Sequence, residues 1–117
     1  MATTHAFAGL AVADYTAAYS WYARLFERPA DMFPHDTEAV WRLSSSCSIY
    51  IVQDAERAGH GLVALAVDDL EAHERRLREA GIAFDAHADG STPRRLVVED
   101  GDGNTLTFFQ DPAQSGT

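Results

Sequence analysis

The chain has 117 residues, of which 46% are hydrophobic and 23% charged, a composition typical of one soluble globular domain. Its formal net charge of −9 argues against a nucleic-acid partner, which needs clustered Lys and Arg, and favours a cationic small molecule. The single cysteine, Cys47, excludes an internal disulfide, and no apolar run reaches the roughly 18–20 residues that cross a bilayer. The first residues also lack a basic leader. We therefore expect a cytoplasmic protein without a membrane partner.

The first half of the chain predicts a strand, a helix and three further strands. A short apolar run ends at Val12 and is followed by Asp14, a residue type that caps the first turn of helices. Apolar residues then recur at helical spacing until Pro29, which stops the helix. Turn residues separate the apolar runs that follow. The predicted strands are 31–33, 38–43 and 48–53.

The second half repeats this plan. Aligning Val67 with Val12 places Asp69 where the first half has Asp14. A second amphipathic helix follows and ends at Gly81, by a different stop signal from that of the first helix. The predicted strands of this half are 84–88, 95–99 and 105–110.

The last strands of the two halves also match each other. Residues 45–54 read SSCSIYIVQD and residues 102–111 read DGNTLTFFQD, so that both segments end on Gln-Asp. Each half therefore predicts a βαβββ module. We expect a single domain, 1–117, whose first module covers about 5–54 and whose second module covers about 60–112.

Five short motifs follow one another along these modules. V-A-D precedes the first helix, W-Y lies inside it, A-V-D-D-L opens the second helix, R-E-A-G-I closes it, and D-G-N precedes the last strand. Their order and spacing over residues 5–112 resemble the glyoxalase/bleomycin-resistance/extradiol-dioxygenase (vicinal oxygen chelate) superfamily. The resemblance implies an α+β fold in which two tandem modules form curved mixed sheets around a ligand-binding cup. It also implies a homodimer, the usual symmetric oligomer.

The resemblance further implies that enzymes of this superfamily hold a divalent metal at four positions with His, Gln or Glu. Carried over by spacing, these positions fall on Phe7, Tyr50, Leu62 and Thr107. None of these side chains offers the imidazole or carboxylate that a divalent ion needs. We therefore expect no metal at the usual site and no cofactor.

A displaced metal site stays open as an alternative. His5 and His60 occupy the same place in the alignment of the two halves, and each precedes an emptied ligand position by two residues. Because residues i and i+2 of a strand share a face, both rings are candidates to face the cup. The plainer interpretation places His5 at a frayed N-terminus and His60 in the polar linker between the modules.

The remaining candidates line the predicted cup. Strand alternation turns the four emptied positions inward, with further aromatic residues beside them or on neighbouring strands. The predicted ligand-binding residues are Phe7, Phe33, Trp41, Tyr50, Leu62, Thr107 and Phe109. Aromatic planes with two hydroxyl groups suit a flat aromatic or cationic small molecule. For each aromatic residue, a place in the core is the alternative.

Two other features have simpler interpretations. His73 lies on the apolar stripe of the second helix and is expected in the core or at its edge, rather than as a ligand. Residues 100–104, DGDGN, resemble the start of a calcium loop, but the sixth and twelfth positions lack the Gly and Glu that such a loop requires. We therefore predict a hairpin turn at this place.

Two functions remain open. The first, which we favour, is a metal-independent binding protein that resembles the drug-sequestering members of the superfamily and gives antibiotic resistance by capturing a drug or natural product. The second is an enzyme, a lyase, isomerase or dioxygenase with a displaced metal site or metal-free chemistry. In that case Tyr50 would act as an acid, or His5 and His60 as bases. Saturable binding without turnover distinguishes the first function from the second.

Overall fold

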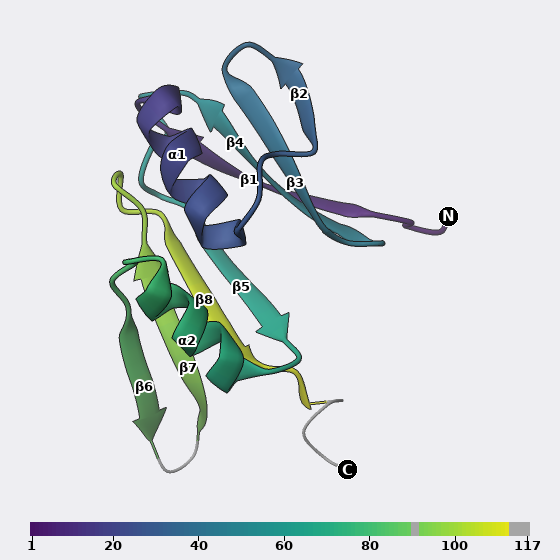
Figure 1. Ribbon diagram of the computed structural model, residues 1–117. Coiled ribbons are helices and arrows are strands. Elements are labelled where there is room, and N and C mark those ends of the chain that lie inside the picture. Colours follow the sequence, from purple (N-terminus) through teal and green to yellow (C-terminus); the bar gives the residue numbers. More distant parts are fainter. Residues whose placement is uncertain (90–91, 113–117) are drawn as a thin grey trace. The chain divides into compact units, whose positions relative to one another are not determined.

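The structure, a computed structural model, describes residues 1–89 and 92–112 and divides them into two compact units. Unit 1 comprises residues 1–61 and 100–104, and unit 2 comprises the described residues of 62–99 and 105–117. Each unit holds one helix and one four-stranded sheet (Figure 1). The elements of unit 1 are β1 (Ala6–Val12), α1 (Tyr15–Phe26), β2 (Met32–His35), β3 (Glu38–Ser44) and β4 (Cys47–Gln53). Those of unit 2 are β5 (Leu62–Val67), α2 (Leu70–Glu79), β6 (Asp85–Asp89), β7 (Thr92–Glu99) and β8 (Thr105–Gln110).

The two sheets have the same topology. Their strand orders are β1-β4-β3-β2 and β5-β8-β7-β6. The first two strands of each order run parallel, and the other neighbours run antiparallel. The predicted α+β fold with two repeated βαβββ modules is therefore confirmed.

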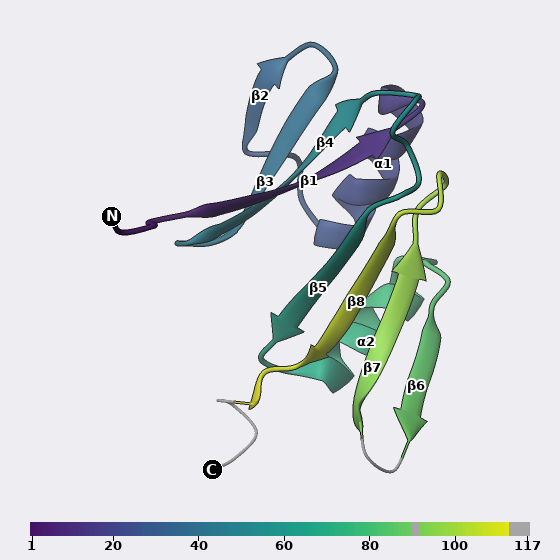
Figure 2. The ribbon, with the colours of Figure 1, turned by 180° about the vertical axis from the view of Figure 1, so that it is seen from behind.

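Each helix covers one face of the sheet in its own unit. In Figure 1 both helices lie in front of their sheets, and in Figure 2, from behind, the sheets lie in front of the helices. We call the helix-free faces the open face of unit 1 and the open face of unit 2. Among the described residues, neither helix has the length and apolar character needed to cross a membrane.

The two helices begin with the same pair of side-chain acceptors. Asp14 accepts a hydrogen bond from the amide three residues later at 3.2 Å, and Asp69 does the same at 3.1 Å. The side-chain oxygens of Gln53 and Gln110 accept from the first amide of α1 and of α2, both at 3.0 Å. Helix starts carry amides without a partner inside the helix, so each acceptor stabilises its helix. The predicted caps are confirmed, and the repeated Gln has the same structural role in both modules.

The strand and helix ends differ from the prediction by a few residues. Gly81, with φ of 72°, provides the left-handed turn after α2 that the sequence predicted. In α1 the left-handed residue is Glu27, two residues before Pro29. β8 matches its predicted bounds, whereas β7 begins at Thr92, three residues early, because the polar residues and Pro93 before Arg95 give no apolar signal.

The core of unit 1 is aromatic and lies between the sheet and α1. Trp41 and Tyr22 are fully buried, with ring centroids 6.1 Å apart, and Phe26 lies 5.6 Å from Trp41. The core of unit 2 is more aliphatic. Its buried residues include Leu70, Leu77, Leu96, Val98, Leu106 and Phe108.

His73 of α2 belongs to this second core, as predicted. Its ring centroid lies 4.2 Å from that of Phe108. Its Nε2 atom is buried and has no hydrogen-bond partner among the described residues. Burial, and secondly the positive charge of Arg76, lower the pKa of His73 below its usual value of 6.5.

The turn at residues 100–104 is the predicted hairpin turn between β7 and β8, and it is also a buried polar cluster of unit 1. The carboxylate of Asp100, 7% exposed, accepts hydrogen bonds from the Tyr22 hydroxyl at 2.7 Å and the Asn104 side-chain amide at 2.8 Å. Asn104 also donates to the carbonyl of Ala11 and accepts from the amide of Gly61, both at 2.8 Å. Burial, and then the Asp100 carboxylate, raise the pKa of Tyr22 far above its usual value, so this hydroxyl stays a donor.

Candidate functional site

The strand register arranges the open face of unit 1 in rows across β1, β4 and β3. Successive residues of a strand point to opposite faces of the sheet. Trp41 contacts the rings of α1, so its neighbours Val40 and Arg42 face away from the helix. The three rows of the open face are Phe7, Ser48 and Arg42; Gly9, Tyr50 and Val40; and Ala11, Val52 and Glu38.

The Tyr50 ring lies directly against the backbone of β1. A Cβ atom on Gly9 would lie 2.3 Å from the Cζ atom of Tyr50, so the ring occupies the space that any other side chain would fill. A glycine inside a strand is typical of such a close approach. The ring therefore lies over β1 at Gly9.

A hollow of ≈ 270 Å³ lies beside this ring, close to the roughly 300 Å³ at which small-molecule pockets begin. Its two sides differ in character. One side is apolar and includes Ala11, Tyr50 and Val52, and the other is polar. The polar side is formed by Asp54, Arg57 and His60, with Arg57 Nε 3.7 Å from Asp54 Oδ2.

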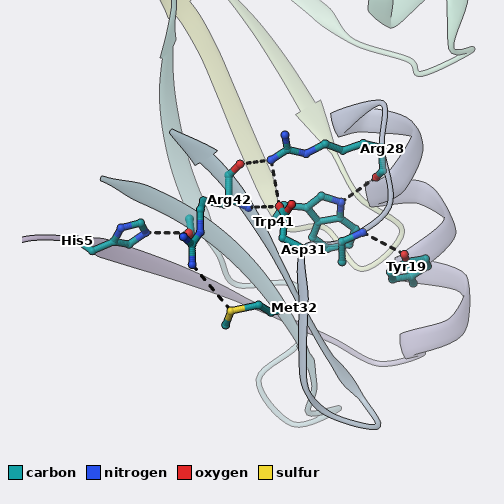
Figure 3. A network of polar contacts seen from close by, with 9 residues as sticks. His5, Tyr19, Arg28, Asp31, Met32, Trp41 and Arg42 are labelled. Carbon is teal, nitrogen blue, oxygen red and sulfur yellow. Dashed lines mark hydrogen bonds and ion pairs between the residues drawn. The ribbon is translucent and has the colours of Figure 1, made fainter. Parts of the chain in front are cut away.

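A second polar cluster lies at the other end of the same face. The His5 Nε2 atom lies 2.8 Å from the Ser48 hydroxyl, and the His5 ring centroid lies 4.6 Å from that of Phe7. The Arg42 guanidinium extends toward the Met32 sulfur, with Nη2 4.0 Å away (Figure 3). Phe7 and Met32 are 54% and 40% exposed. Polar donors therefore lie between two exposed apolar side chains.

Two of the predicted ligand-binding residues lie on the other face of the sheet. Trp41 is fully buried, and its indole N–H donates to the carbonyl of Arg28 at 3.0 Å. The Phe33 ring lies 5.9 Å from that of Tyr19 on α1, although Phe33 is 57% exposed. Phe33 follows Met32 in β2, and Trp41 precedes Arg42 in β3. Because Met32 and Arg42 lie on the open face, their neighbours Phe33 and Trp41 face the helix. The structure therefore places these two residues on the face opposite to that of Phe7 and Tyr50.

The open face of unit 2 carries the other predicted residues. Leu62 is 84% exposed, whereas Thr107 and Phe109 are half-buried. Leu106 and Phe108, which alternate with them on β8, are buried on the helix side. Phe7 with Tyr50, and Leu62 with Thr107, therefore occupy matching places on the open faces of their own sheets.

The two histidines of the alternative metal site lie at different ends of the open face of unit 1. His5 contacts Ser48, whereas His60 lines the hollow beside Val52. Ser48 and Val52 are four residues apart on β4, a distance of about 13 Å. In residues 1–89 and 92–112, no three His, Cys, Asp or Glu side chains form a group that could hold a metal ion. The expected metal independence stays a prediction.

Gly9 and Arg42 were not among the residues predicted from the sequence. Each has a signal in the sequence. A lone glycine within a predicted strand indicates that another group approaches the backbone closely. Arg42 follows Trp41 directly, so parity places the two side chains on opposite faces once Trp41 is known to be in the core.

Comparisons with known proteins give one family and one fold. The sequence model of the Glyoxalase/Bleomycin resistance protein/Dioxygenase superfamily matches residues 4–108. A solved glyoxalase/bleomycin resistance protein from Catenulispora acidiphila DSM 44928 is 36% identical, with a TM-score of 0.87 over 92% of this chain and 98% of that chain. A comparison with curated proteins found no match.

Two further solved structures share the fold at lower identity. TnmS3, an antibiotic binding protein from Streptomyces sp. CB03234, is 21% identical, with a TM-score of 0.70 over 91% of this chain and 93% of that chain. A bleomycin-binding protein complexed with bleomycin is 18% identical, with a TM-score of 0.72 over 92% of this chain and 98% of that chain. At these identities the likeness shows the fold alone.

Proposed function

Because the chain belongs to the Glyoxalase/Bleomycin resistance protein/Dioxygenase superfamily, we propose that it is a metal-independent small-molecule-binding protein that sequesters a drug or natural product. The observation that carries the proposal is the chemistry of four matching open-face positions. Phe7 and Leu62 are 54% and 84% exposed, and Tyr50 and Thr107 are their half-buried neighbours. None of the four side chains carries the imidazole or carboxylate that a divalent metal needs. Exposed apolar groups at these positions favour capture over metal chemistry.

The ligand suited to these faces is flat and partly aromatic. Phe7 offers an exposed ring, and the Tyr50 ring is held over Gly9 beside the hollow of ≈ 270 Å³. Aromatic side chains bind flat ring systems by stacking and by edge contacts. The open face of unit 2, considered by itself, has a hydroxyl on Thr107 and a half-buried ring on Phe109. We assign ligand contact to Phe7, Tyr50, Leu62, Thr107 and Phe109.

The named functions of two structures with this fold support the class of function. One is an antibiotic binding protein, and the other is a bleomycin-binding protein complexed with bleomycin. Capture of this kind requires no catalytic group, which agrees with the residues found at the four positions. We further propose a cytoplasmic homodimer, the usual symmetric assembly. Light scattering should then give twice the chain mass of 12.8 kDa.

Dye binding tests the proposal. N-phenyl-1-naphthylamine, a neutral bicyclic dye, should bind saturably to the native protein, and Phe7→Ala should weaken binding roughly tenfold, since it removes an exposed ring. Phe33→Ala is the matched control, because Phe33 is equally exposed but faces α1. Equal effects of the two variants, or no saturable binding, would contradict the proposal.

Elemental analysis tests metal independence. After exposure to Zn²⁺, Mn²⁺, Fe²⁺ and Ni²⁺ and desalting, the protein should retain almost no metal, and dye binding should be unchanged by EDTA. One metal ion per chain, lost in His5→Ala and His60→Ala, would instead establish the displaced metal site and favour the enzyme.

A further inference from the structure

We propose that the open face of unit 1 binds an anionic group on an aromatic ligand, and that Arg42 is the residue that contacts this group. The proposal rests on the proposed function and names the chemistry of its ligand. Its site, the Arg42 cluster, comprises Arg42, Ser48 and His5 between the apolar side chains of Phe7 and Met32.

The Arg42 guanidinium has no carboxylate partner in the part of the chain that the structure describes. Its described side-chain contact is the Met32 sulfur at 4.0 Å, and a thioether is only a weak acceptor. By contrast, Arg28 is paired with Asp31 at 3.1 Å and Arg78 with Glu74 at 2.6 Å. Arg42 therefore presents its five N–H donors for a ligand rather than for the fold.

The acidic residues near Arg42 are engaged elsewhere. Asp31 accepts from the side chain of Arg28 and, at 2.7 Å, from the backbone amide of Arg42, so it holds the strand and not the guanidinium (Figure 3). Glu38 lies two rows away and faces His35 at 3.8 Å. The backbone of Arg42 is thus fixed while its positive charge stays uncompensated on the open face.

The neighbours of Arg42 fit an anion that is joined to a ring system. Ser48, in the same row, is fully buried, and its hydroxyl lies 2.8 Å from His5 Nε2, so it positions the His5 ring. Phe7 completes the row with an exposed ring. Tyr50 lies two residues along β4 from Ser48, about 7 Å away. The distance from Ser48 to Tyr50 is similar to the length of a bicyclic aromatic system. A ligand of this size can therefore place its anionic group at Arg42 and its rings over Phe7 and Tyr50.

This ligand differs from the one that the net charge favours. A formal charge of −9 predicts a cationic partner, but charges more than about 10 Å apart are screened at ordinary ionic strength. The charge of the residues near the site, and not the net charge of the protein, therefore determines which ligand the site favours. In unit 2 the position that corresponds to Arg42 holds Glu99, which is paired with Thr105, so the positive charge at this position is found in unit 1 alone.

Two dyes that differ by one anionic group test the proposal. 8-Anilinonaphthalene-1-sulfonate is N-phenyl-1-naphthylamine with an added sulfonate. At about 0.15 M salt, where the distant acidic groups are screened, the native protein should bind it about tenfold more tightly, as expected for a charge-assisted contact. The affinity ratio of the two dyes should fall to about one in Arg42→Gln. Arg42→Lys keeps the charge and should keep a ratio above one. Arg24→Gln, a change of the same charge at an exposed site on α1, is the control.

The outcomes separate this proposal from the proposed function. Equal affinities for the two dyes in the native protein, or the same ratio in Arg42→Gln and Arg24→Gln, would overturn the anion site while Phe7→Ala still weakens both dyes. If Phe7→Ala leaves both dyes unaffected, the proposed function itself fails. Thermal unfolding of each variant confirms that the protein compared is folded.

Discussion

The two units share their strand topology and their helix caps, and they differ on their open faces. Asp14 and Asp69 cap the helices alike, but the matching open-face pairs are Gly9 with Tyr50 in unit 1 and Ala64 with Thr107 in unit 2. In unit 1 the glycine on β1 leaves room for the ring of Tyr50 on β4. In unit 2 the methyl group of Ala64 on β5 lies beside the shorter side chain of Thr107 on β8. The two side chains fit each other in both pairs, but the pairs differ in total size and in chemistry.

The charges on the open faces are reversed between the units. Arg42 pairs with Ser48 on β4, whereas at the same place Glu99 pairs with Thr105 on β8. Two rows further, Glu38 corresponds to Arg95 in the same way. Helix caps must satisfy backbone amides, so they change little between the units, whereas an exposed face is free to take the chemistry that a ligand requires.

The largest expected effect comes from removing the buried carboxylate of Asp100, whose counterpart turn in the first module is exposed. Asp100→Ala leaves the Tyr22 hydroxyl, the Asn104 side chain and two backbone amides without their acceptor, at a cost of about 3–5 kcal/mol in the free energy of unfolding. Ser45→Ala, in the corresponding exposed turn of the first module, should cost almost nothing. Urea titrations measure both values, and similar losses would show that the Asp100 cluster is not structural.

A smaller effect on stability is expected when Gly9 and Tyr50 are replaced, one after the other, by the Ala and Thr that unit 2 has at the same positions. Gly9→Ala places a Cβ atom in the Tyr50 ring, and the ring must swing away, at a cost of about 1–2 kcal/mol and with loss of dye binding. Adding Tyr50→Thr reproduces the Ala and Thr pair of unit 2 and should restore stability but not dye binding. If the double variant is no more stable than Gly9→Ala, the two residues are not coupled.

The smallest effect depends on pH and concerns His73, whose counterpart in α1 is Ala18. Because the pKa of His73 is lowered from 6.5 in the folded protein, the unfolded chain binds the proton more tightly. This contribution to stability is present above about pH 6.5 and is lost as the pH falls through the lowered pKa. His73→Ala should therefore reduce the loss of stability between about pH 7.5 and pH 5, measured by urea midpoints. Equal losses of stability over this pH range in the native protein and in His73→Ala would contradict the prediction. The control is His87→Ala, because His87 is exposed.

Most of the fold could be predicted from the sequence because both halves of the chain carry the same βαβββ pattern. The repeat of the helix-opening Asp located both caps, and the shared Gln-Asp ending aligned the last strands of the two modules, whose Gln also caps a helix. Strand alternation also placed Phe7 and Tyr50 on one face, as the register confirms. Helix caps depend on residues that are close in sequence, and side chains alternate between the two faces of a strand. Both can therefore be predicted from a short segment of the chain.

The tertiary structure decided the rest. Phe33 and Trp41 are aromatic like Phe7, but the sheet face on which each lies follows from pairing with distant strands and from contact with α1. The Asp100 cluster likewise joins Tyr22 to a turn 78 residues away. The sequence by itself determined the repeat, the caps and the absence of metal-binding side chains at four positions. Which aromatic residues are core, and that Arg42 has no carboxylate partner among the described residues, depends on long-range contacts that no local pattern encodes.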